Sequence, residues 1–475
     1  MEATTRKVPS QKSSQMAPTS SWGQAVRQWL QTPVDIAVLV YFRIAFGAIM
    51  IWEMWRYTDR GWISRYWIEP SFNFTYYGFD WVQPWPGIGM YIHFGVMALL
   101  ALFILLGLWY RFSTILFFLG FSYIFLLEQA QYLNHFYLII LISFIMIFLP
   151  ANRAFSVDAW RSGSRFGKLS ASRSDWMPGW SLWLLRFQIA VPYFFGGIAK
   201  LNGDWLQAQP MEIWLASRTD FPLIGQYFTE KWMVYGISYG GLLLDLLVVP
   251  FLLWRKTRPF AFIAALTFHL MNVRLFSIGI FPWFMIAATA VFFDPSWPRQ
   301  LLKSLGFSKQ TEPKPDKISL SKIGFALLAS YVLLQILLPL RHYIIPGNVS
   351  WTEDGHRFAW HMKLRDKDAD ITFFITDEAG ERWQADSSLH LTARQQRKMS
   401  TRPYMVVQYA HFLAAEMAEQ GQGEVVVQAE AWVSLNGRSP QQLIDPTVNL
   451  AAQPRTIWPV EWVLPLTTPL FPNNP

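Results

Sequence analysis

The chain of 475 residues contains no cysteine, and charged residues make up only 15% of it. The absence of cysteine excludes disulfides, thiolate metal sites and cysteine nucleophiles, and it leaves the redox compartment open. An ordinary soluble domain has about 25% charged residues, whereas this chain is 52% hydrophobic. The first 30 residues contain no apolar stretch of the kind found in a cleavable secretory signal. We therefore expect a membrane protein whose first apolar span directs its insertion.

Long apolar runs account for the low charge, and they stop near Leu340. About 20 apolar residues in a helix cross a hydrocarbon core about 30 Å thick. The candidate spans are Ile36–Trp55, Met90–Leu108, Phe112–Leu127, Leu133–Leu149, Leu182–Ile198, Trp232–Trp254, Phe260–Met271, Leu275–Phe293 and Ile323–Leu340. Residues 260–271 are few and residues 112–127 are marginal, so either run could be tilted, re-entrant or merged with a neighbour. We predict about nine spans, with an uncertainty of about two.

Lysine and arginine residues, which give a net charge of +8, lie in short segments between the apolar runs. They do not form one basic face with interleaved aromatics, so nucleic acid is not an expected partner. With the N-terminus in the cytoplasm, nineteen of them fall in inside segments and seven in outside segments. We expect a multi-pass protein of a bacterial inner membrane with a cytoplasmic N-terminus. An odd number of spans then places the region after Leu340 in the periplasm.

The region from Arg341 to Pro475 has a different pattern. Alternation in Ile371–Ile375 and Glu424–Val433 predicts half-buried strands, and residues 377–380 and 435–437 supply turns. Thr392–Glu419 has the composition of a surface helix. The predicted fold is therefore a polytopic α-helical membrane protein with a mostly β extramembrane domain. Its divisions are a disordered or amphipathic N-terminus (1–31), a helical transmembrane domain that carries the chemistry (32–340) and the extramembrane domain (341–475).

Polar side chains inside the spans are costly, so they either pair with each other or line a functional cavity. They are Arg43, Glu53, Asn134, His135, Arg186, Gln188, Asp245, His269 and Asn272. One interpretation pairs Arg186 or Arg43 with Asp245 or Glu53 to fix helix packing. In another, Asn134 with His135, and His269 with Asn272 on one helix face, contact a polar ligand. Two histidines without a carboxylate cluster are a weak metal signal, so we expect no metal.

Lys200 follows an apolar, glycine-rich run at the outer end of a predicted span. It could be an interfacial lysine whose ammonium reaches water. Alternatively, partial burial would disfavour the ammonium and make the neutral amine available as a base. Asp204, one turn later, would favour the ammonium if it lay close. Both interpretations remain open.

These residues belong to motifs found in one family. From Thr32 to about Pro465 the chain resembles the vitamin K-dependent γ-glutamyl carboxylases. The matching motifs include Thr32-Pro33, Tyr41-Phe42-Arg43, Leu106–Arg111, Asn134-His135, Ser156–Asp158, Lys200-Leu201, Asp204-Trp205, Gly240–Leu246, Phe268-His269, Met271-Asn272, Leu275–Gly279, Trp297–Arg299, Trp432–Ser434 and Asp445-Pro446. Motifs in the same order across both the spans and the extramembrane domain make the resemblance specific.

The resemblance implies an activity. A lysine at the position of Lys200 deprotonates vitamin K hydroquinone, whose reaction with oxygen yields a base strong enough to remove a γ-proton from glutamate. Carbon dioxide then adds, leaving γ-carboxyglutamate and vitamin K epoxide. Asn134 and His135 would contact the oxygenated quinone or the substrate. The quinone pocket would include His269, Asn272, Phe276 and Ser277, and the glutamate site would include Trp360, Met362 and Arg365.

The expected partners are a glutamate-containing protein or peptide and membrane lipid, and the oligomeric state is unknown. Animal carboxylases have two consecutive lysines where this chain has Ala199-Lys200, which leaves one candidate base. Two cations, Lys363 and Arg365, replace an apolar residue and a histidine of the glutamate-binding stretch. Arg365 is either a clamp on the substrate carboxylate or a surface charge on an exposed strand.

Alternative functions are hydroquinone epoxidation without carboxylation, and non-catalytic quinone or lipid binding. Without duplicated halves or paired broken spans, a transporter is a weaker alternative.

Overall fold

The computed structural model describes residues 22–162, 174–307, 314–315 and 318–470. Eight of the nineteen basic residues assigned to inside segments lie outside these ranges: Arg6, Lys7, Lys12, Arg165, Lys168, Arg173, Lys309 and Lys317. Of the predicted N-terminal segment 1–31, only residues 22–31 are described. They form an amphipathic helix, α1 (Trp22–Gln31), in which Trp29 packs against Trp183 with ring centroids 4.4 Å apart.

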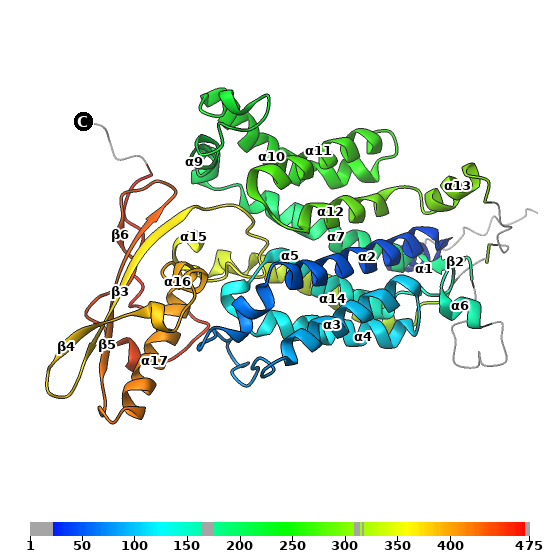
Figure 1. The fold of residues 1–475 in the computed structure, drawn as a ribbon. Helices are drawn as coiled ribbons and strands as arrows, with labels where there is room; N and C mark the ends of the chain where they lie inside the picture. The colour runs from blue at the N-terminus through cyan, green and yellow to red at the C-terminus, as the bar shows by residue number, and fades with distance from the viewer. Residues whose placement is uncertain (1–21, 163–173, 308–313, 316–317, 471–475) are drawn as a thin grey trace, which may run out of the picture.

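A bundle of apolar helices carries a sheet-containing domain at one end (Figure 1). The apolar helices are α2 (Ala37–Asp59), α3 (Gly89–Leu106), α4 (Tyr110–Leu126), α5 (Asn134–Phe148), α7 (Gly179–Ala199), α10 (Lys231–Leu253), α11 (Arg258–Phe276), α12 (Phe281–Thr289) and α14 (Lys322–Leu340). Shorter elements join them: β1 (Pro33–Asp35), α6 (Val157–Arg161), β2 (Trp176–Pro178), α8 (Gly203–Leu206), α9 (Met211–Ala216) and α13 (Trp297–Ser304). Helices α1, α6 and α13 lie at the end of the bundle opposite the sheet (Figure 1).

Every predicted apolar run coincides with a helix. Among the described residues, six helices are long and apolar enough to cross a membrane: α2, α3, α7, α10, α11 and α14. Helices α4, α5 and α12 are apolar but shorter. The chain is therefore a helical protein with several membrane-spanning candidates, and the count of nine spans stays a prediction.

The boundary between α11 and α12 differs from the predicted one. The seventh run was expected to be short, yet α11 extends to Phe276 and has 19 residues. Ser277 and Gly279 then adopt left-handed backbone conformations, with φ of 51° and 66°. Because that conformation cannot continue a right-handed helix, α12 begins only at Phe281. His269 and Asn272 consequently lie within one continuous helix.

The buried arginines do not pair with the acidic residues named in the packing interpretation. Arg43 donates to the carbonyl oxygens of Ala151 at 2.7 Å and Phe155 at 2.6 Å. Arg186 donates to carbonyl oxygens at the end of the α12 segment, among them that of Phe293 at 2.9 Å. These contacts provide hydrogen bonds to backbone oxygens that have no helical partner. A backbone oxygen without a hydrogen bond costs free energy in an apolar environment. Glu53 pairs with Arg56, so the predicted pairing was wrong.

Residues 341–470, here called the outer domain, form a four-stranded antiparallel sheet with two helices. The sheet order is β4 (Arg382–Ala385), β3 (Lys367–Thr376), β5 (Val426–Leu435) and β6 (Gln441–Gln442). The helices are α16 (Ala393–Met399) and α17 (Pro403–Glu419), after the short α15 (Val349–Thr352). Alternate residues of β5 are buried beneath α17, and Tyr409 contacts Phe373 with ring centroids 5.0 Å apart. The two predicted strands are confirmed, but the domain is a mixture of helix and sheet, since α17 covers the core instead of lying on the surface.

Polar contacts join the outer domain to the helices. Arg438 donates two hydrogen bonds of 2.7 Å to the carboxylate of Asp204, and Asn436 donates a third, also of 2.7 Å. On another side, Gln395 donates to the buried carboxylate of Glu128 at 2.8 Å. Asp204 lies four residues after Lys200, so the outer domain holds the segment that follows this lysine.

Candidate active site

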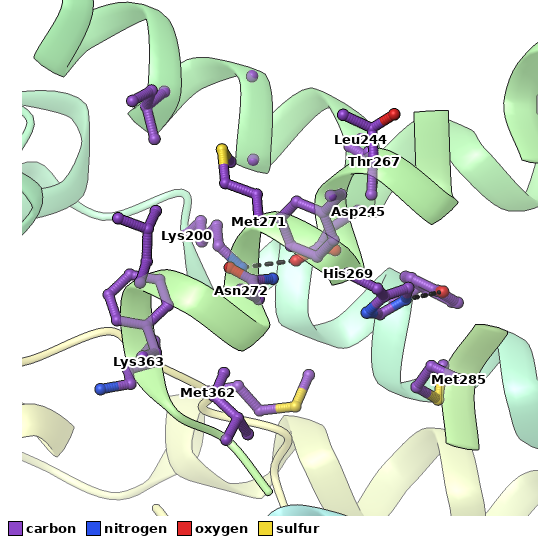
Figure 2. Close-up of a pocket in the computed structure, with 18 of the residues that line it drawn as sticks. Lys200, Leu244, Asp245, Thr267, His269, Met271, Asn272, Met285, Met362 and Lys363 are labelled. Atoms are coloured by element: carbon purple, nitrogen blue, oxygen red, sulfur yellow. Dashed lines mark hydrogen bonds and ion pairs between the residues drawn. The ribbon is translucent and has the colours of Figure 1, made fainter. Parts of the chain in front are cut away.

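A cavity of about 480 Å³ lies where α7, α10, α11 and α12 meet the connecting loop, residues 358–366, that leads into the sheet (Figure 2). Most of its wall is glycine, aliphatic, methionine or aromatic. The ionisable and amide side chains on the wall are Lys200, Asp245, His269, Asn272, Lys363 and Tyr193. Such a mostly apolar pocket with a few polar groups is typical of a site for a small, largely apolar molecule.

Lys200 is the residue that ends α7. Its Nζ donates to Asp245 Oδ2 at 2.6 Å and to the carbonyl oxygen of Gly196 at 3.3 Å, and it lies 5.2 Å from the Trp205 ring centroid. Lys200 and Asp245 are only 6% and 4% exposed. Lys200 therefore does not extend to the surface, and the burial that its interpretation as a base requires is present.

Two glycines of α7 allow this pairing. A Cβ atom at Gly197 would lie 2.7 Å from the side chain of Leu246, so only glycine lets α10 approach so closely. A Cβ atom at Gly196 would lie 3.4 Å from Asp245 Oδ2 and 3.2 Å from Met362 Cε. The glycine-rich run therefore brings the carboxylate on α10 to the end of α7.

Asp204 is not the counter-ion of Lys200. Its carboxylate is bound by Arg438 and Asn436 of the outer domain. The condition under which Asp204 would favour the ammonium is therefore not met, because Asp204 binds the outer domain and Asp245 lies beside the lysine.

Three of the four residues predicted for the quinone pocket line the cavity: His269, Asn272 and Phe276. His269 Nε2 lies 2.6 Å from the hydroxyl of Tyr193, which lines the same cavity. Asn272 has no hydrogen-bonding partner among the described residues, so its amide is available to a ligand. Ser277 is exposed in the break after α11 and does not line the cavity.

Asn134 and His135 lie beside the cavity and are not part of its wall. Asn134 Nδ2 donates to the carbonyl oxygen of His361 at 3.0 Å, which fixes the connecting loop. The His135 ring stacks on Phe281, a wall residue, with centroids 5.6 Å apart. Within the described part of the chain the His135 ring has no hydrogen-bonding partner. A direct contact of His135 with a ligand would require Phe281 to move.

The connecting loop is held in an unusual conformation. Phe358, Trp360 and Lys363 have positive φ values of 61°, 61° and 50°, which cost free energy for residues with a side chain. Trp360 is fully buried against Tyr137, with ring centroids 5.0 Å apart, and this packing compensates for the strain. Met362 and Lys363 consequently reach the cavity, whereas Trp360 supports the loop from behind.

Two family models match the chain. The HTTM domain matches residues 31–297, and the lumenal domain of the vitamin K-dependent gamma-carboxylases matches residues 320–469. The chain belongs to the vitamin K-dependent gamma-carboxylase family. This confirms the resemblance inferred from its motifs, and no solved structure matches the chain.

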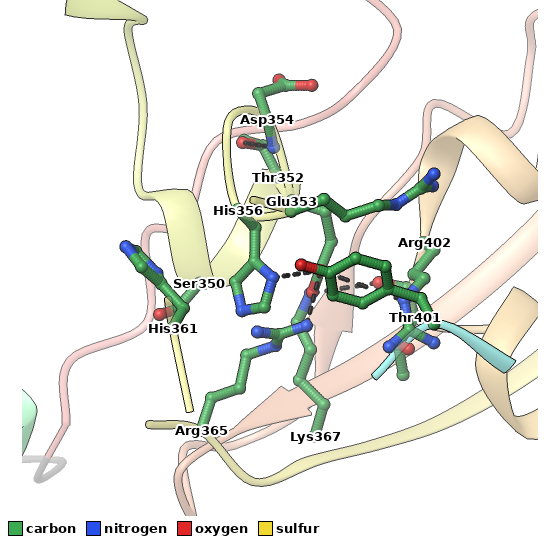
Figure 3. A network of polar contacts seen from close by, with 12 residues as sticks. Ser350, Thr352, Glu353, Asp354, His356, His361, Arg365, Lys367, Thr401 and Arg402 are labelled. Atoms are coloured by element: carbon green, nitrogen blue, oxygen red, sulfur yellow. Dashed lines mark hydrogen bonds and ion pairs between the residues drawn. The ribbon is translucent and has the colours of Figure 1, made fainter. Parts of the chain in front are cut away.

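Arg365 is not a surface charge on an exposed strand, which was one of its two interpretations, because its side chain is only 13% exposed and the strand begins at Lys367. It lies in the connecting loop, and its Nη2 donates to Glu353 Oε2 at 2.5 Å (Figure 3). Lys367 Nζ donates to Glu353 Oε1 at 3.1 Å, and Arg402 Nε lies 4.0 Å away. Burial alone would raise the pKa of Glu353, but these cations outweigh it and lower the pKa to about 2. A substrate carboxylate at Arg365 would have to compete with Glu353 for Nη2.

Motif matching missed three site residues of this gamma-carboxylase family member: Asp245 as the partner of Lys200, Tyr193 as the partner of His269, and Lys363 on the wall. The sequence indicated that Asp245 has a partner, because an acidic side chain inside a membrane span must be paired. Tyr193 precedes Lys200 by two helical turns in the glycine-rich run, but its bond to α11 depends on tertiary packing. None of the described residues forms a group of three or more histidine, aspartate or glutamate side chains suited to a metal ion.

The Lys200–Asp245 pair is the chemically distinctive feature of the cavity. In a buried, apolar site a charged ammonium–carboxylate pair competes with the neutral amine and carboxylic acid, because charge separation is stabilised less than in water. Moving the shared proton to Asp245 creates a free amine that faces the cavity. The pair can therefore accept a proton from an acidic hydroxyl without burying a net charge before the reaction.

Proposed function

We propose that this protein converts glutamate side chains of proteins or peptides to γ-carboxyglutamate with carbon dioxide, coupled to epoxidation of vitamin K hydroquinone by oxygen. The observation that carries this proposal is a buried lysine, Lys200, paired with Asp245 on the wall of an apolar cavity. The two family matches, which together cover most of the chain, support it.

The chain's own contribution begins with the proton held by Lys200 and Asp245. Vitamin K hydroquinone supplies an acidic hydroxyl and, after reaction with oxygen, the strong base that removes the γ-proton of glutamate. With the shared proton on Asp245, the free amine of Lys200 takes the hydroxyl proton. The resulting ammonium is balanced by the oxyanion of the hydroquinone, and the neutral carboxylic acid of Asp245 accepts a hydrogen bond from it at 2.6 Å. No side chain is basic enough to remove the carbon-bound proton itself, so the lysine is needed only for the first, easier proton transfer.

Asn272 and His269 orient the ring of the quinone. The free amide of Asn272 can donate to one ring oxygen, and the Tyr193–His269 hydrogen bond fixes the imidazole on the wall. His269 Nδ1 is buried without a partner among the described residues, which leaves it available to a ligand. These two residues share a face of α11, one turn apart.

Residues of both α10 and α11 line the cavity, and the wall formed by α10 contains glycines. Gly236 and Gly240 lie one turn apart on α10, line the cavity and are exposed on the outside of the bundle. A Cβ atom at either position would meet nothing within 4 Å, so this gap lacks side chains. We infer that the apolar tail of the quinone leaves through it.

We further propose that all nine apolar helices lie in the membrane, with the N-terminus in the cytoplasm. The basic segments carried by α6 and α13 then lie on the cytoplasmic side, because both helices are at the end opposite the outer domain (Figure 1). The outer domain faces the periplasm in this orientation. A glutamyl substrate would therefore be modified on that side.

The activity can be tested with the purified protein in lipid nanodiscs. Vitamin K hydroquinone, oxygen and a short glutamyl peptide are supplied with labelled carbon dioxide, and epoxide and peptide-bound label are both measured. Formation of both products supports the proposal. Epoxide without label supports the epoxidase alternative, and saturable quinone binding without epoxide supports a non-catalytic binding protein.

A further inference from the structure

Lys363 is a cation of the cavity wall that makes no direct ion pair, although the carboxylate of Asp366 attracts it from farther away. Lys200 is neutralised by Asp245, whereas Lys363 has no ion pair or hydrogen bond among the described residues. Its side chain lines the cavity and is also exposed, so it stands at the mouth, where the connecting loop meets water (Figure 2).

Two aromatic rings hold the ammonium of Lys363. Its Nζ lies 4.6 Å from the centroid of Phe276 and 5.1 Å from that of Trp214. The two rings pack edge to face with centroids 5.5 Å apart, and Trp214 Nε1 donates to Asp366 at 3.1 Å. Aromatic faces attract a cation without accepting strong hydrogen bonds from it. The N–H groups of Lys363 therefore remain available to an anion at the mouth.

The other cations of this region are already engaged or lie elsewhere. Arg365, Lys367 and Arg402 surround Glu353, away from the cavity wall (Figure 3). Backbone conformation separates the two groups: the left-handed φ of Lys363 turns its side chain to the cavity, and Arg365, two residues later, reaches Glu353. Only Lys363, among the described residues, combines a cavity position with an unpaired positive charge.

We propose that Lys363 binds the side-chain carboxylate of the glutamyl substrate at the cavity mouth. This inference rests on the proposed function and assigns the carboxylate to Lys363 in place of Arg365. An ammonium contacts a carboxylate oxygen at about 2.7–2.9 Å. The reacting γ-carbon is bonded directly to that carboxylate, so this contact holds it beside the quinone cavity.

The charge of Lys363 also fits the chemistry at the γ-carbon. When the C–H bond breaks, its electron pair stays on a carbon that already carries a carboxylate, and two negative charges become neighbours. A cation in contact with the carboxylate stabilises this state more than the starting glutamate. The carbon then forms a bond to carbon dioxide, and the second carboxylate is produced next to the same ammonium.

The test replaces Lys363 with methionine, which keeps an unbranched chain against the two rings and removes the charge. Lys363→Arg keeps the charge, and Lys231→Met removes an exposed lysine that is not on the cavity wall. We expect Lys363→Met to raise the KM for a short glutamyl peptide roughly 10- to 100-fold, the usual effect of losing a charge-assisted hydrogen bond. Less label should then be fixed per epoxide formed at low peptide concentration, whereas Lys363→Arg should stay within about threefold of the unaltered protein.

A binding measurement keeps this test separate from the proposed reaction. A fluorescent glutamyl peptide and its glutamine counterpart are titrated against the unaltered protein and the methionine variant, without quinone. Preference for glutamate that disappears in Lys363→Met supports the assignment even if no carbon dioxide is fixed. A peptide KM unchanged within threefold, or the same glutamate preference in both proteins, overturns it. Absence of epoxide and label in the unaltered protein refutes the proposed function alone.

Discussion

Replacing Lys200 by alanine should both inactivate the protein and destabilise it. The substitution leaves the Asp245 carboxylate, which is 4% exposed, without its partner at 2.6 Å. Removing one member of a buried ion pair costs about 3–5 kcal/mol, because the remaining charge is neither solvated nor paired. The end of an ordinary membrane span tolerates an aliphatic side chain, but this position does not.

The double variant Lys200→Met/Asp245→Leu isolates the cause. It removes both charges and keeps similar volumes, a replacement that is often neutral or stabilising in proteins. We expect its thermal midpoint to match that of the unaltered protein, while Lys200→Ala unfolds several degrees lower. Tryptophan fluorescence follows both, since the chain contains 25 tryptophans.

Activity separates the two variants again. Both should lose hydroquinone epoxidation by a factor of about 10²–10⁴, the usual contribution of a positioned base. An added small primary amine should restore part of the rate in Lys200→Ala, where Asp245 can hold it, but not in the double variant. Epoxidation at the unaltered rate in either variant would refute the base assignment. A double variant less stable than Lys200→Ala would refute the pairing argument.

Four further outcomes are expected. Arg438→Met, which removes two hydrogen bonds to Asp204, should make the outer domain more sensitive to protease in nanodiscs, and unchanged cleavage kinetics would contradict the proposed clamp. Gly240→Leu should raise the KM for a long-tailed quinone more than for a tail-less one; equal effects would count against lateral entry. The charge of Arg402 and burial lower the pKa of Lys398 from 10.5 to about 6. Between about pH 6 and pH 10.5 the unfolded chain therefore binds more protons than the folded protein, and the stability of the folded protein rises with pH in this range. Lys398→Met should therefore raise the thermal midpoint more at about pH 6 than at about pH 9, and the opposite order would be inconsistent with this shift. Protease added to spheroplasts should cleave the outer domain, whereas cleavage of an N-terminal tag alone would reverse the topology.

The helices were predictable because apolarity is a local property of the sequence. Each apolar run became a helix, and the only large boundary error, at Ser277 and Gly279, arose where two left-handed residues interrupt an otherwise apolar stretch. The strands β3 and β5 were visible for the same reason, as alternation is also local. The single helix predicted over Thr392–Glu419 is two helices, α16 and α17, because Pro403 starts a new helix, and the burial of α17 depends on the sheet that it covers.

The pairing of side chains was much less predictable. Lys200 was identified as the central residue, but Asp204, four positions away, was the only acid considered near it, and Asp245, 45 positions away, was assigned to an arginine. Sequence proximity favoured Asp204, whereas the packing of two glycines against α10 selects Asp245. In the connecting loop, the sequence favoured Arg365 over Lys363 for the glutamate site, but the left-handed backbone turns Lys363 to the cavity and leaves Arg365 beside Glu353.

The bond between Arg438 and Asp204 has a consequence for how the protein can be divided. The helices and the sheet are separate in sequence, and a designer might cut between them. The cavity, however, includes Met362 and Lys363 of the connecting loop. In addition, Asp204, which follows Lys200, is hydrogen-bonded to Arg438, more than two hundred positions away. The working geometry of the cavity therefore belongs to the complete chain, and transplanting the cavity to another scaffold would require both halves together.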